Sequence, residues 1–185
     1  MKKTLVIIDM NRGFCKEGAL HDTRILDIVP EIIRYCESVP EDRRIFVSDA
    51  HEADAREFSD YPPHCLKGSA ESAIIEELSA YIPKKTSLGI PALVEKNSTN
   101  AAWAMDLETL CNQSDEVMIV GCCTDICIMQ FALSLQSYIN HHQKACKLRV
   151  PEAAVSTFHI PDVHDALTYQ SFALQIMKNA GISIQ

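Results

Sequence analysis

The sequence lacks any excess of positive charge. It carries 17 lysines and arginines against 25 aspartates and glutamates, a formal net charge of −8, and no run of basic residues offsets it. A chain with this balance is repelled by nucleic-acid phosphates and by anionic membrane surfaces. We therefore expect neither a nucleic acid nor a membrane as its partner.

Long hydrophobic segments are also absent. No stretch approaches the length of a transmembrane helix, and the first apolar run, Leu5–Ile8, is too short for a signal peptide and ends at Asp9. Two separated C-x-x-C pairs, the mark of a zinc ribbon, are missing as well. We expect a cytoplasmic, reducing location, in which the eight cysteines remain free thiols.

The order of apolar patterns is typical of an α/β protein. Short apolar runs predict strands, and 3.6-residue spacing predicts helices between them. The strands are expected at 4–8, 44–48, 92–95, 116–120, 146–150, 153–156 and 182–185, and the helices at 25–36, 71–81, 101–111, 125–140 and 162–179. This alternation favours one three-layer α-β-α domain over residues 1–185, with a mainly parallel sheet of about six strands and helices on both faces. No repeat, low-complexity segment or linker interrupts it.

The most informative segment is EVMIVGCCTDIC, residues 116–127. Its apolar run ends in a turn rich in cysteine, and an amphipathic segment with Thr124 or Asp125 as the expected helix N-cap follows. Ligands of open α/β sheets bind at the carboxyl ends of the strands. A thiol in the first turn of the following helix also feels the positive end of the helix dipole, which favours thiolate. Cys127 occupies that place.

Two further strands end in a reactive side chain. Asp9 follows the first strand and Lys96 follows the third, so a parallel sheet would gather both near Cys127. The carboxylate can take the thiol proton and later return it to a leaving group, while the ammonium stabilises both anions. The backbone N–H groups of Cys123 and Cys127 could face a developing oxyanion. Taken singly, each residue has a structural alternative: a core thiol, a helix cap or a solvated lysine.

A second cluster lies in the long polar segment 50–70 and just before it. Asp49, His51, Glu57 and His64 offer two imidazoles and two carboxylates, which suit one divalent ion such as Zn, Mn or Fe. Loops of this length inside a compact domain are usually functional. The alternative is a polar surface loop without metal.

The ordered combination of these motifs resembles the isochorismatase-like cysteine hydrolases, and within them the nicotinamidase/pyrazinamidase branch. The segments that carry the resemblance span nearly the whole chain: LVIIDMNRGFCKEGAL, FVSDAHEADAREF, YPPHCLKGS, VEKNST and VGCCTDICIMQFAL. The chain departs from the family pattern where Asn11-Arg12-Gly13 replaces the usual Q-N-D, and where Glu152 stands in place of a frequent Asp.

The resemblance implies a role for each residue of these motifs. Cys127 would be the nucleophile, Asp9 the general base and then acid, and Lys96 the third member. A cis peptide bond between Cys122 and Cys123 would help to form the oxyanion hole. Zn is the expected metal, and the ligand set would be Asp49, His51 and His64 with Glu57, which stands where a third His is frequent. The substrate ring would lie between Phe14 and Tyr61, with Trp103 lining the same pocket.

The function implied by the resemblance is hydrolysis of the small molecule nicotinamide, and of pyrazinamide, to the acid and ammonia. Three alternatives stay open. The chain could act on another amide, a ureide or a vinyl ether; it could be a binding or assembly module without catalysis; or a metal-activated water could do the hydrolysis with Cys127 as a bystander. Homo-oligomers are frequent in the family, so a homo-oligomer is one state in which the chain could occur.

Overall fold

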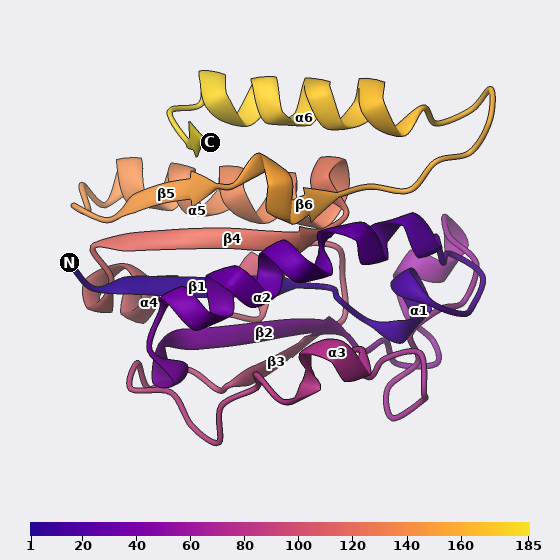
Figure 1. Cartoon of the computed structure of the whole chain (residues 1–185), viewed down its shortest axis with the longest axis horizontal. Helices are drawn as coiled ribbons and strands as arrows, with labels where there is room; N and C mark the ends of the chain where they lie inside the picture. The colour runs from indigo at the N-terminus through magenta and orange to yellow at the C-terminus, as the bar shows by residue number, and fades with distance from the viewer.

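A computed structural model describes residues 1–185, and its centre is one parallel sheet. The strand order is β3-β2-β1-β4-β5-β7, and the short β6 pairs with β4 beyond β5 (Figure 1). The strands are β1 (Lys3–Ile8), β2 (Arg44–Asp49), β3 (Leu93–Lys96), β4 (Glu116–Cys122), β5 (Lys147–Val150), β6 (Val155–Ser156) and β7 (Ser183–Ile184).

Helices cover both faces of this sheet. Helices α2 and α3 lie on one face, α4 and α5 lie on the other, and α6 packs against α5 and β7 (Figure 1). The bounds are α1 (Arg12–Cys15), α2 (Val29–Ser38), α3 (Glu76–Ser79), α4 (Leu107–Gln113), α5 (Met129–His141) and α6 (Ala166–Asn179). The predicted three-layer α/β fold is confirmed, with seven strands where about six were expected.

The central strands β1 and β4 consist mostly of apolar residues because both of their faces are buried. Along β1, Leu5 and Ile7 enter the core beneath α2, whereas Val6 and Ile8 enter the core beneath α4 and α5. Every residue of β4 is buried. Continuous apolar runs of this kind are characteristic of strands in parallel sheets.

Three predicted helices are shorter than their patterns indicate. Of 71–81 only α3 is helical; 101–111 is divided into a 3₁₀ turn at Ala101–Trp103 and α4; and 162–179 becomes helical only at Ala166. In the last two cases an aspartate that lies after the predicted start of the helix is its N-cap residue. The carboxylate of Asp106 accepts from the Thr109 N–H at 3.0 Å, and that of Asp165 accepts from the Thr168 N–H at 2.9 Å.

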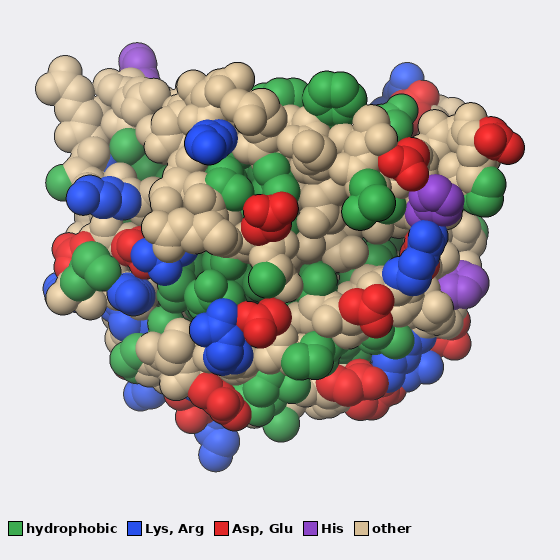
Figure 2. Space-filling view, turned by 45° about the horizontal axis from the view of Figure 1, so that its top comes forward, with side chains coloured by type: hydrophobic (Ala, Val, Ile, Leu, Met, Phe, Trp, Pro, Cys, Tyr) green, Lys and Arg blue, Asp and Glu red, His purple; other side chains and the backbone are tan.

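The surface carries charges of both signs, and the thiols lie in the interior. Figure 2 shows Lys and Arg side chains lying among Asp and Glu side chains on one face, without a continuous basic patch. All eight cysteines are buried free thiols. None of the helices has the length and apolar character needed to cross a bilayer.

Candidate active site

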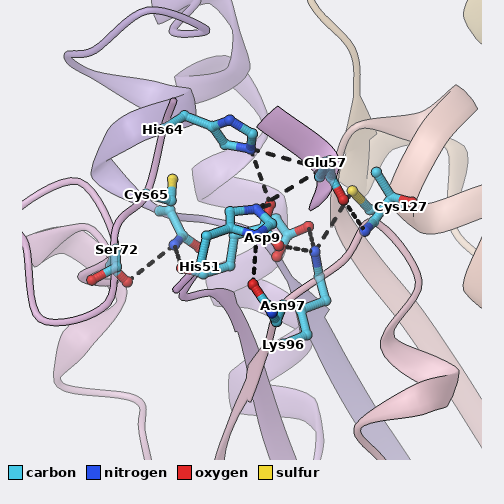
Figure 3. Close-up of polar contacts among 12 residues, drawn as sticks. Asp9, His51, Glu57, His64, Cys65, Ser72, Lys96, Asn97 and Cys127 are labelled. Carbon is cyan, nitrogen blue, oxygen red and sulfur yellow. Dashed lines mark hydrogen bonds and ion pairs between the residues drawn. The ribbon is translucent and has the colours of Figure 1, made fainter. Parts of the chain in front are cut away.

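The carboxyl ends of four neighbouring strands bring the predicted reactive residues together. Asp9 follows β1, Asp49 ends β2, Lys96 ends β3 beside Asp49 in register, and Cys127 lies in the turn after β4. The Lys96 Nζ atom is 2.8 Å from Asp9 Oδ2 and 3.9 Å from Cys127 Sγ, and it also donates to Asp49 Oδ1 (Figure 3). The ammonium thus joins two carboxylates and the thiol.

Burial sets the protonation behaviour of this group. Burial raises the pKa of Asp9 to about 7, against the opposing effect of Lys96. Burial also raises the pKa of the Cys127 thiol well above its ordinary value, again opposed by Lys96. The pKa of Lys96 rises because the attraction of Asp9, Cys127 and Asp49 outweighs its burial. The resting group therefore pairs a thiol with a carboxylate whose pKa suits a general base near neutral pH.

We expect Lys96 to contribute to the stability of the fold as well as to the chemistry of the site, because it pairs with two buried carboxylates. We expect Lys96→Met to lower the free energy of unfolding by about 3–5 kcal/mol, because the buried carboxylates of Asp9 and Asp49 lose their counter-ion. Denaturant unfolding followed by circular dichroism measures this. The matched control is Lys67→Met, whose ammonium forms exposed pairs with Glu52 and Glu95 and is expected to change stability by about 0–1 kcal/mol. Equal effects of the two substitutions would contradict the role of the buried pair.

Gly121 allows β1 and β4 to approach closely just before the reactive residues. Its φ is +116°, and a Cβ atom there would lie 2.0 Å from the Ile8 carbonyl oxygen. Asp9, which directly follows the last residue of β1, also has a positive φ, of 54°. Such a φ is rare for a residue other than glycine. Unusual backbone conformations of this kind concentrate at functional sites.

A π-helical turn, Thr124–Ile128, carries Cys127 out of β4 and into α5. The Cys123 carbonyl oxygen accepts from the N–H groups of Ile126 and Ile128, both at 3.1 Å. The peptide bond between Cys122 and Cys123 is cis, as the resemblance implied. The sequence predicted Thr124 or Asp125 as the N-cap of the helix that follows β4. This prediction was wrong, because Cys123 is the N-cap residue and no side chain caps the turn.

The second predicted cluster also converges. Asp49, His51 and His64 are buried, and their nearest ligand atoms all lie within 4.8 Å of one another. Nε2 of His51 is 3.5 Å from Asp49 Oδ2, and Nε2 of His64 is 3.8 Å from the same oxygen. Glu57 Oε1 lies 3.9 Å and 4.0 Å from these two nitrogens (Figure 3). Three donor atoms, from Asp49, His51 and His64, therefore converge, and Glu57 approaches the two histidines.

The remaining atoms of these side chains are held by protein groups. Nδ1 of His64 is 2.8 Å from the Pro62 carbonyl oxygen, and Nδ1 of His51 is 3.2 Å from Asn97 Oδ1. The other oxygen of Glu57 accepts from the Thr99 N–H at 3.1 Å. These contacts orient Nε2 of each imidazole toward the cluster, as outer contacts do for metal-binding histidines. The buried Nε2 of His51 has no hydrogen-bond partner, which fits a nitrogen reserved for a divalent metal ion.

One cavity of about 170 Å³ opens onto both groups. Cys127, Asp49 and His64 form part of its lining, and apolar and aromatic side chains form much of the rest: Phe14, Ala19, Leu20, Tyr61, Ile126, Phe158 and Ile160. Phe14 and Tyr61 thus line this cavity. The placement of Trp103 in the same pocket was wrong: its side chain is 82% exposed on a separate surface with Leu107 and Tyr138.

The sequence did not single out Asn97, Thr99, Leu20, Ile126 or Phe158. Asn97 and Thr99 follow Lys96 directly, so their position just beyond a strand end could have indicated a role at the same edge. Leu20, Ile126 and Phe158 carry no such signal, because apolar residues are equally frequent in ordinary cores.

Comparison with known proteins identifies the family. A family model described as "Isochorismatase domain" matches residues 3–180. The chain belongs to the isochorismatase family. One relative of this isochorismatase-family protein is Nicotinamidase 1 of Arabidopsis thaliana, 29% identical over 156 residues that cover 74% of this chain. The match spans 61% of the length of that relative.

Solved structures share the whole fold of this isochorismatase-family chain. Nicotinamidase PncA from Bacillus subtilis is 25% identical with a TM-score of 0.78, and the match covers 100% of this chain and 99% of that one. Pyrazinamidase of Pyrococcus horikoshii, in complex with zinc, is 23% identical with a TM-score of 0.73, over 100% of this chain and 99% of that one.

Proposed function

We propose that this protein is a nicotinamidase, which hydrolyses nicotinamide, and also pyrazinamide, to the carboxylic acid and ammonia. The observation that carries the proposal is the cavity that Cys127 shares with three members of the predicted metal cluster, Asp49, Glu57 and His64. A thiol beside a carboxylate and an ammonium suits acyl transfer from an amide. The similarity to Nicotinamidase 1 and to nicotinamidase PncA supports the same activity.

In the first half of the reaction, Cys127 Sγ attacks the carboxamide carbon while its proton passes to the carboxylate of Asp9. The backbone N–H groups of Cys123 and Cys127 hold the developing oxyanion. Asp9 then gives the proton to the amide nitrogen, the carbon–nitrogen bond breaks, and ammonia leaves. Lys96 remains charged throughout and stabilises the thiolate and the carboxylate in turn.

In the second half, Asp9 takes a proton from a water molecule that attacks the thioester carbon. The carbon–sulfur bond breaks, the proton returns to the sulfur of Cys127, and nicotinate is released. Asp9 acts as base and then acid in each half of the reaction, which suits a carboxyl group with a pKa of about 7.

The cluster of Asp49, His51, Glu57 and His64 would hold a divalent metal, with zinc favoured by two imidazoles and two carboxylates. When bound, the ion would fix the pyridine nitrogen and so position the ring. The zinc complex of the Pyrococcus pyrazinamidase supports this assignment. Phe14 and Tyr61 would hold the two faces of the ring.

Metal content tests the ligand set without any enzymatic assay. We expect His51→Ala and His64→Ala to lose tightly bound metal, because each removes a nitrogen aimed at the shared point. Asn97→Ala, which removes the partner of His51 Nδ1, is expected to weaken metal affinity by about 10–100-fold. Elemental analysis after dialysis against a weak chelator measures all three. His142→Ala, on an exposed residue at the end of α5, is the control, and equal metal content in all variants would contradict the assignment.

A substrate panel separates this function from other hydrolyses of the family. Nicotinamide and pyrazinamide are expected to be turned over far faster than isochorismate or a ureide, because only the first two present a ring nitrogen to the metal cluster. Preference for either of the last two would show that the chain acts on another amide, ureide or vinyl ether.

Two other readings make different predictions. A non-catalytic binding or assembly module would turn over none of these compounds, although the reactive trio of Asp9, Lys96 and Cys127 is intact. Hydrolysis by a metal-activated water would survive alkylation of Cys127. We expect alkylation to inactivate the enzyme and substrate to protect it.

A cytoplasmic location belongs to the same proposal and is supported by the eight free thiols. The homo-oligomer stays a prediction.

A further inference from the structure

A largely buried pair of side chains, Asp125 and His164, takes no part in the reaction described above. Nε2 of His164 is 2.8 Å from Asp125 Oδ2, and Nδ1 is 2.9 Å from the Phe158 carbonyl oxygen. The second carboxylate oxygen of Asp125 accepts from the hydroxyl of Thr157. Only 8% of His164 is exposed. Asp125 lies two residues before Cys127, within the π-helical turn.

The His164 ring has contacts at its edge and on both of its faces. Its two nitrogens face oxygen acceptors, the carboxylate of Asp125 and the carbonyl of Phe158. The rings of Phe158 and Tyr169 stack on His164 with centroids 3.9 Å away, at interplanar angles of 14° and 27°. Two rings at this distance must occupy opposite faces. These contacts together fix the position and orientation of the His164 ring.

His164 also holds one wall of the cavity. Phe158, His159 and Ile160 line that cavity, and the His164 backbone exchanges two hydrogen bonds with Ile160, of 2.8 Å and 2.9 Å. The ring of His164 therefore touches the wall at Phe158, its backbone closes the loop at Ile160, and its Nε2 reaches the turn that carries Cys127.

We infer that His164 is a positioning residue that joins two parts of the site, and that Asp125 is its partner on the nucleophile side. The bond to Asp125 fixes the π-helical turn and therefore the direction of Cys127 Sγ. The bond to the Phe158 carbonyl fixes the wall against which the substrate ring packs. The inference rests on the proposed function for its kinetic consequences, but the geometry of the turn does not depend on the substrate.

Two amide substitutions separate the two bonds. His164→Gln keeps a donor near the former Nε2 and loses the donor to Phe158, whereas His164→Asn keeps a donor near the former Nδ1 and loses the donor to Asp125. We expect His164→Gln to raise KM for nicotinamide about 10-fold with kcat nearly unchanged, since one hydrogen bond of the wall is lost. His164→Asn is expected to lower kcat about 10-fold with KM nearly unchanged.

The control is His142→Ala, on an exposed histidine remote from the cavity, which is expected to keep both kinetic constants. A merely structural role would lower the active fraction, and with it kcat, in both His164 variants alike. That result, or wild-type constants in both, overturns the inference. Both amide variants retain one of the two bonds, so the test does not depend on the folding of His164→Ala.

A second readout keeps this inference separate from the proposed function. The alkylation rate of Cys127 by iodoacetamide, followed by peptide mass, needs no substrate. We expect His164→Asn to change that rate several-fold relative to His142→Ala, and His164→Gln to leave it close to that of the control. Wild-type protein that fails to hydrolyse nicotinamide overturns the proposed function alone. Equal alkylation rates in all three variants overturn the positioning role.

Discussion

Cys127→Ala is expected to lower the rate of ammonia release from nicotinamide by on the order of 10⁴-fold or more. In the proposed mechanism the sulfur of Cys127 is the atom that forms and breaks the bond to the acyl carbon, so its removal leaves no nucleophile for that step. The substitution removes one side-chain atom, so the fold should be retained. Steady-state ammonia assays and denaturant unfolding of the same samples measure both expectations.

Cys36→Ala is the matched control for this variant. Cys36 is an equally buried thiol, but it lies on α2 in the core and does not line the cavity. We expect it to cost some stability and to leave the turnover of the folded protein unchanged. If Cys127→Ala released ammonia at the wild-type rate, the nucleophile would be another group, and a metal-activated water would become the better account.

Asp9→Asn is expected to lower kcat by on the order of 10²–10⁴-fold. The amide has nearly the shape of the carboxylate, but it cannot take the thiol proton or return one to the departing nitrogen. Lys96 keeps its contact with Asp49, so the variant tests proton transfer with the ammonium still in place. Steady-state kinetics with nicotinamide measure the loss in kcat.

The control for proton transfer is Asp60→Asn, an exposed carboxylate in the loop that pairs only with Arg56. It is expected to leave kcat unchanged. A wild-type kcat in Asp9→Asn would show that another base accepts the thiol proton.

Much of this site could be predicted from the sequence, because parallel strands impose a simple geometry. Strands that end in Asp9, Asp49 and Lys96 must present those side chains at one edge, and the register of β2 with β3 places Asp49 opposite Lys96. The four strands that carry the reactive residues are adjacent in the sheet, in the order β3-β2-β1-β4, so their carboxyl ends lie side by side. Local apolar pattern was therefore sufficient for the fold class and for the reactive edge.

Two side-chain placements could not be predicted from the local sequence pattern. Asp125 has the residue type and place of a helix cap, yet its carboxylate turns to His164, 39 positions away. Trp103 has the residue type of a substrate contact, but the 3₁₀ turn that carries it directs the ring to solvent. For Asp125 a pairing between distant segments decided the outcome, and local pattern holds no information on such pairings. For Trp103 the residue type did not indicate the direction that the 3₁₀ turn gives to the side chain.

Ammonia release from nicotinamide, measured on the same preparation before metal removal, after metal removal and after zinc is restored, tests the central claim most directly. The account predicts rapid release by the metal-loaded protein, a large loss once elemental analysis shows the metal gone, and recovery with zinc. Absence of release from the metal-loaded protein, or an unchanged rate in protein shown to be metal-free, would contradict it.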